Sequence, residues 1–167
     1  MLVLRFLILV VLLNLARYLV GGLLEAWTVA PRLFGEMAAH PSYFVQEFGT
    51  WDWVTSFAYN FVMWLTAAWF FHLARPSLRG SDLLASLKAF ALAWLFFASV
   101  SFIYMNHYSH PRGFYLYNIL DGVIAFGIVA IANALLLDDT ERAHLLDPGA
   151  VVVDVDPVAH VEPVAVE

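Results

Sequence analysis

The residues of this chain best suited to chemistry gather in one polar stretch, residues 104–122, which joins two long apolar runs. It contains His107 and His110 in a short loop, followed by Asn118 and Asp121 in the next apolar run. Imidazoles coordinate metals or transfer protons, and a carboxylate within a membrane span typically marks an ion, proton or ligand site. The stretch therefore raises two alternatives, a metal site in the loop and a polar site inside the membrane.

The first apolar run has a polar face of its own. At about 100° per residue, Asn14, Arg17, Gly21, Glu25 and Thr28 fall within one narrow arc of a helix. Two further runs have similar polar or small faces, formed by Ser56, Asn60, Met63 and Ala67 in one and by Asn118, Asp121, Gly122, Ala125 and Ala132 in the other. Because the opposite faces are bulky and apolar, we expect lipid around them and the polar faces together inside a bundle.

Two interpretations of these faces stay open. Asparagines and small residues often only hold membrane helices together through hydrogen bonds and close packing. Charged residues within spans instead tend to mark function, here a polar cavity open to the outer side. The candidate ligand-binding residues are Asn14, Arg17, Glu25, Asn60, His107, His110, Asn118 and Asp121.

Arg17 and Asp121 are predicted to pair. With the first span ending near residue 24 and the fourth beginning near residue 114, both lie about 10 Å below the outer surface. A helical side chain tilts toward the N-terminus of its helix, which for Arg17 is deeper into the membrane. Arg17 therefore needs a partner at its own depth. If the first span instead ends at Gly21, Arg17 becomes an interfacial anchor.

A metal or cofactor is not expected. His107 and His110 are three apart, and Glu36 and His40 are four apart, spacings that zinc or iron sites use. A proline follows both His40 and His110, however, which suits turns better than a helical ligand set. A haem between helices would need two histidines at similar depth. His72 lies near the inner end of the second span and His107 just beyond the outer end of the third, so the two are nearly a bilayer apart.

Composition identifies an integral membrane protein. The chain has 167 residues, 62% of them hydrophobic and only 13% charged, and a mean hydropathy of +0.77. It has no cysteine, which excludes disulfides and thiolate chemistry. Residues 1–137 have a net charge of +1 and the tail from Asp138 a net charge of −7. The body has no basic excess suited to nucleic acid.

The predicted fold class is all-α, a polytopic four-transmembrane-helix up-down bundle with a disordered acidic C-terminal tail. The spans are about 2–24, 53–74, 83–104 and 114–137, with an outer loop at 25–52 and the tail at 138–167. Ala85, Ala89 and Ala93 form a small-residue stripe that lets a neighbouring helix approach closely. Within the outer loop, residues 32–40 and 42–48 are each predicted as a short surface helix. A cleaved signal peptide is the alternative for the first run.

The positive-inside rule places both termini in the cytoplasm, in a plasma membrane or bacterial-type inner membrane. Four spans put both ends of the chain on one side, where most of the basic residues then lie. The residues on that side are Arg5, Arg75, Arg79, Lys88 and Arg142, against Arg32 and Arg112 on the other.

No catalytic pattern is present in the sequence: it has no HExxH, no glycine-rich phosphate loop and no paired carboxylates within a span. We therefore expect a non-enzymatic accessory or assembly subunit that presents its outer loop to a partner. The alternative is a small transporter or ligand-binding protein with an outward-facing polar cavity around Arg17 and Asp121. A metal- or quinone-linked redox enzyme is a third hypothesis. The expected surroundings are the lipid bilayer and a protein partner or homo-oligomer, without nucleic acid.

Overall fold

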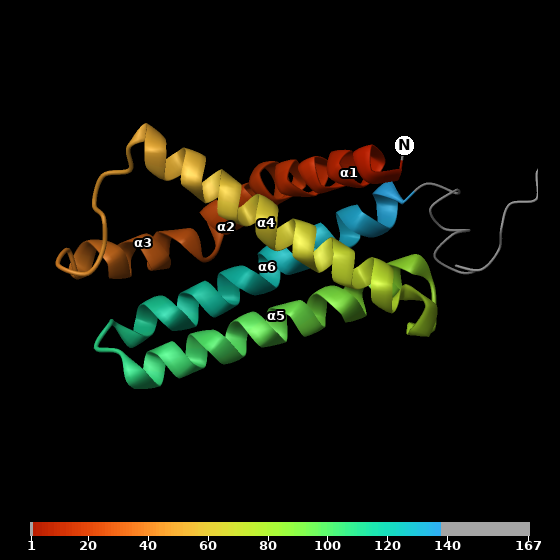
Figure 1. Ribbon diagram of the computed structural model, residues 1–167. Coiled ribbons are helices and arrows are strands. Elements are labelled where there is room, and N and C mark those ends of the chain that lie inside the picture. The colour runs from red at the N-terminus through yellow and green to blue at the C-terminus, as the bar shows by residue number, and fades with distance from the viewer. Residues whose placement is uncertain (1, 138–167) are drawn as a thin grey trace, which may run out of the picture.

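The computed structural model describes residues 2–137 (Figure 1). The acidic tail, for which the sequence predicts disorder, lies outside the described residues. Four helices are long and apolar enough to cross a membrane, which confirms the predicted all-α membrane fold. The first span consists of α1 (Leu2–Ala16), the π-helical turn η1 (Arg17–Gly21) and α2 (Gly22–Trp27). The second consists of α4 (Thr50–Ala74) and the 3₁₀ turn η2 (Arg75–Ser77). The third is α5 (Asp82–His107) and the fourth is α6 (Arg112–Leu136).

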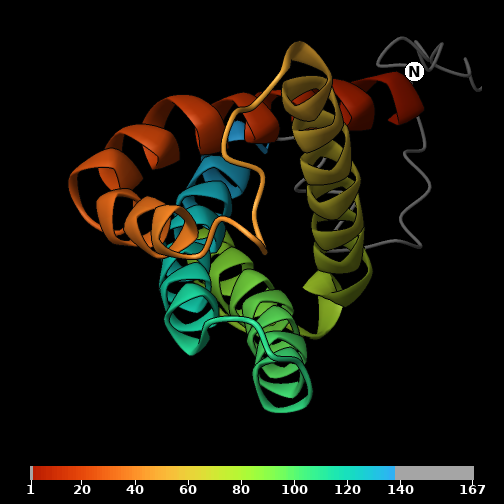
Figure 2. The ribbon, with the colours of Figure 1, turned by 90° about the vertical axis from the view of Figure 1, so that its left-hand side faces the viewer.

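The four spans run up and down. Helices α5 and α6 lie side by side along their length, and α4 crosses the bundle at an angle (Figures 1 and 2). The first span packs against both α4 and α6. We call the end where α1 begins the N-terminal end of the bundle and the opposite end, where α3 lies, the α3 end.

Side chains inside the bundle form one apolar core. Trp64 of α4 is fully buried and packs edge-on against Phe126 of α6, with the ring centroids 5.0 Å apart. Large apolar residues also cover the outside of the bundle, among them Phe96, whose exposed fraction is 74%. Soluble proteins rarely expose such continuous apolar surface, so lipid is the natural solvent of this face.

The small-residue stripe of α5 faces its neighbour as predicted at two of its three positions. Ala85 and Ala89 are buried, and between them the Ser86 hydroxyl donates to the Ala130 carbonyl at 2.8 Å. Asn133 of α6 donates in turn to the Ser86 hydroxyl at 3.1 Å. Because small side chains let the two backbones approach, these hydrogen bonds fit inside the helix pair.

The connection between the first two spans is folded onto the bundle. Helix α3 (Ala30–Ala39) confirms that the first of the two predicted short helices forms, and it packs on α6. The prediction of a second helix at residues 42–48 was wrong, since those residues form turns and bends. Phe44 there packs against Phe114 with ring centroids 4.6 Å apart, and Gln46 donates back to the Met37 carbonyl. These tertiary contacts outweigh the weak helical preference of so short a segment.

Candidate functional site

Three charged side chains meet inside the bundle. The Arg17 guanidinium lies 2.8 Å from a Glu25 carboxylate oxygen and 3.6 Å from an Asp121 carboxylate oxygen. Only 15%, 9% and 16% of the three side chains are exposed. The predicted contact of Arg17 with Asp121 is confirmed, but Glu25 is the nearer partner. We call Arg17, Glu25 and Asp121 the charge centre.

The π-helical turn η1 explains why Glu25 reaches Arg17. In η1 the Gly22 amide donates to the Arg17 carbonyl, five residues back. In a regular helix Arg17 and Glu25 would differ in direction by about 80°. One extra residue in the turn rotates everything that follows by about 100°, which leaves the two side chains about 20° apart. The turn therefore brings both onto one line of the helix.

Gly21 lies beneath the Arg17–Glu25 ion pair. A Cβ atom placed on Gly21 would be 3.6 Å from a Glu25 carboxylate oxygen and 3.8 Å from an Arg17 guanidinium nitrogen. These are ordinary contact distances, so a methyl group fits and a longer side chain would displace the pair. Because glycine has no side chain, the Arg17 and Glu25 side chains can meet above Gly21.

The charge centre lies well inside the two spans that carry it. Because the first helix continues to Trp27, Arg17 is about 15 Å from its end, and Asp121 is about 14 Å from the start of α6. Each of these helices has 25 residues and is about 37 Å long, so a hydrocarbon core about 30 Å thick centred on it would place both charges about 10 Å inside the core, at the depth that the sequence predicts. The guanidinium also reaches toward the α3 end, against the tilt expected from helix geometry, because Glu25 is there to pair with it.

A chain of neutral polar groups extends from α1 to α4 beside the centre. Asn60 donates to the Tyr18 hydroxyl at 3.1 Å, and the Tyr18 and Ser56 hydroxyls lie 3.2 Å apart. Asn14, fully buried, donates to the Phe57 carbonyl at 3.4 Å. Asn14, Ser56 and Asn60 lie on the inward faces that the sequence predicts. The part of Tyr18 in these hydrogen bonds was not predicted; its place next to Arg17 in the chain was the one indication of it.

Several polar atoms near the centre have no partner within residues 2–137. One carboxylate oxygen of Glu25 and the amide oxygen of Asn14 are buried without a hydrogen bond. Asn118, one turn from Asp121 on α6, is half-buried and forms no hydrogen bond to any described residue. With two carboxylates and one guanidinium, the ionised centre has a net charge of −1. One added proton or monovalent cation would therefore make the centre neutral.

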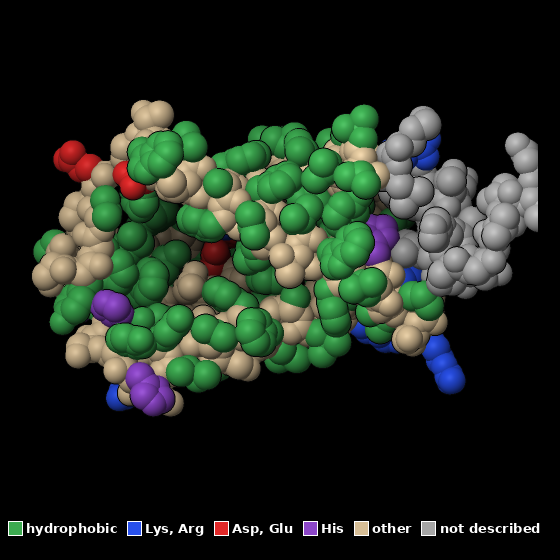
Figure 3. Space-filling view, viewed as in Figure 1, with side chains coloured by type: hydrophobic (Ala, Val, Ile, Leu, Met, Phe, Trp, Pro, Cys, Tyr) green, Lys and Arg blue, Asp and Glu red, His purple; other side chains and the backbone are tan. Residues whose placement is uncertain are grey.

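The centre is recessed without being sealed. Figure 3 shows an acidic side chain at the bottom of a hollow midway along the bundle, in a face otherwise covered by apolar side chains. The residual exposure of Arg17 and Asp121 agrees with such access. The hollow therefore opens on the apolar side of the bundle, midway along its length.

The loop histidines do not join this centre or each other. His107 contacts the Ile103 carbonyl through Nδ1 at 2.9 Å, whereas His110 contacts the Tyr115 hydroxyl at 2.9 Å. His110 lies among the rings of Tyr43, Phe44 and Tyr108. Within the described part of the chain, no group of three or more histidines and carboxylates is placed to hold a metal ion. His110 therefore lies in an aromatic interface under the connection, whereas His107 is exposed and contacts its own helix.

None of the family models, curated proteins or solved structures compared with this chain matches it. Its function must therefore be inferred from the charge centre itself, which combines two ion pairs, largely buried side chains and a carboxylate oxygen without a partner among residues 2–137.

Proposed function

We propose that this chain is a small multi-pass membrane protein that binds or transports a small cation at the charge centre. The observation that supports the proposal is the second carboxylate. Arg17 alone can be neutralised by one acid, yet it has two, and one oxygen of Glu25 has no partner among residues 2–137. An ion pair that only holds helices together would not need the second carboxylate.

The energetics favour an occupant. A charge near the middle of a bilayer costs roughly 2.5–3.5 kcal/mol on insertion scales unless it is paired. A proton, a hard monovalent cation or a small ammonium group would remove the excess negative charge of the centre. The unpartnered carboxylate oxygen of Glu25 is a suitable ligand for all three.

A concentration-jump measurement on membranes adsorbed to a solid support tests the proposal. Jumps of sodium, potassium, protons or ethylammonium should each be applied to proteoliposomes that contain the wild-type chain. We expect a transient current from at least one of these cations, because binding at depth moves charge across part of the membrane. Glu25→Gln should abolish that current.

Glu36→Gln is the matched control, since Glu36 lies in α3 outside the spans. It should leave the current unchanged. No current from any of the four cations in the wild type, or an unchanged current in Glu25→Gln, would contradict the proposal.

The orientation belongs to the proposal as well. Arg5, Arg75, Arg79 and Lys88 lie toward the N-terminal end of the bundle, and Arg32 and Arg112 toward the α3 end. The positive-inside rule then places the N-terminal end in the cytoplasm. A reporter fused after Leu78 should be cytoplasmic and one inserted at Ser42 should be outside. Cytoplasmic signal from Ser42 would reverse the orientation.

A second candidate function, an accessory subunit, is favoured by a different observation. The connection before α4 exposes large apolar side chains, among them Phe34, Val45 and Phe48. Such a surface at the membrane boundary suits contact with another membrane protein. A photo-crosslinking residue at Phe34 or Phe48 should then capture one defined protein, while the same residue at the lipid-facing Phe96 should not.

A further inference from the structure

An apolar groove runs between α4 and α5, away from the charge centre. Its volume is about 560 Å³. Ala67 of α4 and Ala93 of α5 are among the residues that line it, while the exposed rings of Phe70 and Phe96 stand beside them. Ala93 is the third member of the small-residue stripe and borders this groove, whereas Ala85 and Ala89 are buried. Small residues on facing helices thus leave a furrow between larger neighbours.

The lining of the groove offers almost nothing to water or ions. Thr66 is its one polar side chain, and the threonine hydroxyl already donates to the Val62 carbonyl at 2.9 Å. No charged residue lines it. An occupant must therefore be apolar along the groove, which in a bilayer means a hydrocarbon chain or another apolar side chain.

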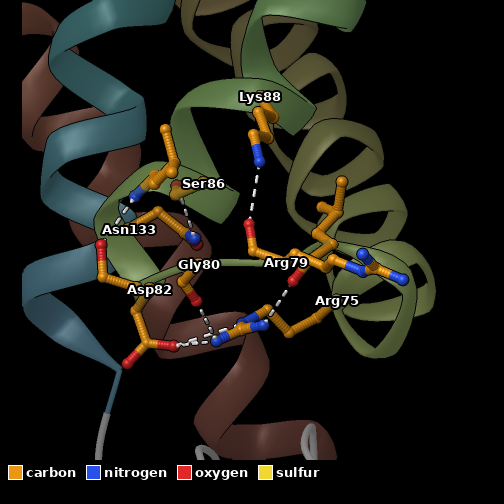
Figure 4. A network of polar contacts seen from close by, with 10 residues as sticks. Arg75, Arg79, Gly80, Asp82, Ser86, Lys88 and Asn133 are labelled. Carbon is orange, nitrogen blue, oxygen red and sulfur yellow. Dashed lines mark hydrogen bonds and ion pairs between the residues drawn. The ribbon is translucent and has the colours of Figure 1, made fainter.

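Two cations lie beyond the end of the groove nearest the N-terminal end of the bundle. Lys88 is four residues before Leu92, which lines the groove, so the two share a face of α5. The Lys88 amine donates to the Arg79 carbonyl at 2.8 Å, which holds it over the α4–α5 connection. In Figure 4, Arg79 extends away from the Arg75–Asp82 pair. Neither Lys88 nor Arg79 has a carboxylate within ion-pair distance among residues 2–137.

Arg75, in the same connection, is already neutralised and satisfied. Its guanidinium lies 2.8 Å from an Asp82 carboxylate oxygen and also donates to the carbonyls of Leu78 and Gly80 (Figure 4). The connection therefore combines one structural arginine with two exposed cations that have no acidic partner in the described part of the chain.

The dimensions match one leaflet. Along α5 the distance from Lys88 to Val100, the lining residue farthest from it, is about 18 Å. Half of a hydrocarbon core is about 15 Å. A lipid with its headgroup at Lys88 would therefore extend its acyl chain through the groove to near the bilayer centre.

We propose that the α4–α5 groove binds an anionic phospholipid of the leaflet at the N-terminal end, with an acyl chain in the groove and the phosphate at Lys88 and Arg79. The charge of the two cations selects an anionic headgroup, and the apolar groove holds the chain. Basic pockets between membrane helices commonly bind anionic lipids in this way. This inference rests on residues separate from the charge centre and holds whether or not that centre binds a cation.

Native mass spectrometry of the delipidated protein in detergent tests this inference. The protein should be titrated with phosphatidylglycerol and with phosphatidylcholine of the same chain length. We expect one tightly bound phosphatidylglycerol, with an affinity higher than that for phosphatidylcholine by on the order of tenfold. The double variant Arg79→Gln, Lys88→Gln should bind both lipids alike. The double variant Arg32→Gln, Arg112→Gln, at the α3 end, is the matched control and should keep the preference.

A groove-filling variant separates the chain from the headgroup. Ala93→Phe should weaken binding of both lipids, and Leu92→Trp serves if Ala93→Phe does not fold. Equal binding of the two lipids by the wild type, or unchanged phosphatidylglycerol binding in the groove variants, would overturn the proposal. A dimer that excludes lipid would likewise show that a second copy fills the groove.

Discussion

Arg17 and Arg75, the first partly buried and the second buried, have opposite surroundings. Arg75 has one acidic partner, Asp82, seven residues away, and two backbone carbonyls that accept its remaining donors. Arg17 has two acidic partners, one of them on a different helix, and lies well inside its span. The surroundings of Arg75 are balanced in charge and local in sequence. Those of Arg17 have one more acid than base and include a residue far away in the sequence.

We infer from this difference that the Arg75 pair stabilises the fold and that the charge centre has a role beyond stabilisation. The Arg75 pair ties the α4–α5 connection together at the end of the bundle, where the Asp82 side chain is still 26% exposed and hydrated. The charge centre places an excess carboxylate where hydration is poor, which is costly without an occupant. A protein that needed only a helix contact could have used one acid, as it does at Arg75.

The largest expected effect is that of Arg17→Ala. Removing the arginine leaves Glu25 and Asp121 facing each other without a counter-charge, which should lower the free energy of unfolding by about 3–5 kcal/mol. Unfolding in mixed detergent micelles measures this. Arg32→Ala, at an exposed residue of α3, is the control and should have little effect.

A double-mutant cycle tests the predicted coupling directly. Arg17→Ala combined with Asp121→Ala should cost clearly less than the sum of the single losses, because the second change removes a carboxylate that the first left unpaired. Additive losses would show that the 3.6 Å contact contributes nothing.

Arg75→Ala should cost less, about 1–3 kcal/mol. Asp82 can turn to water, so the main loss is that of the donors to the Leu78 and Gly80 carbonyls. The neighbouring Arg79→Ala is the matched control and should be nearly neutral. A loss from Arg75→Ala as large as that from Arg17→Ala would remove the distinction between the two arginines.

Much of the fold follows from the sequence because membrane spans impose simple rules. Length and hydropathy predict the four helices, and the alternation of direction fixes which ends meet. The docking of the connection on α6 was not predicted, because it depends on contacts such as that of Phe44 with Phe114, far apart in the chain. Nor did the alanine stripe reveal that α4 would leave a groove beside Ala93.

The charge centre was predictable only in part. Arg17 and Asp121 could be paired because antiparallel spans place them at matching depths. Glu25 could not be identified as the nearest partner, since a π-helical turn leaves no mark in a periodic pattern and changes the direction of every later residue. The assignment of these residues to ligand binding stays a prediction until the cation experiment is done.

Glu25→Gln sharpens the comparison by making the two arginines alike. The amide can still hydrogen-bond Arg17, and the centre becomes a one-to-one pair with Asp121. If the second carboxylate serves a ligand, stability should change by less than about 1 kcal/mol while cation binding is lost. A loss comparable to that of Arg17→Ala would instead mean that Glu25 is the structural partner and Asp121 the additional acid.

The smallest effect is expected at Gly21, beneath the Arg17–Glu25 pair. Gly21→Ala places a methyl group at ordinary contact distance from both charged groups, so the free energy of unfolding should change by less than about 1 kcal/mol. Gly22→Ala is the matched control, because nothing lies within 4 Å of its Cβ position. The leucine variants then separate the sites: Gly21→Leu should displace the ion pair and abolish the cation-dependent current, whereas Gly22→Leu should keep it. Equal behaviour of the two leucine variants would show that the current does not depend on the Arg17–Glu25 pair above Gly21.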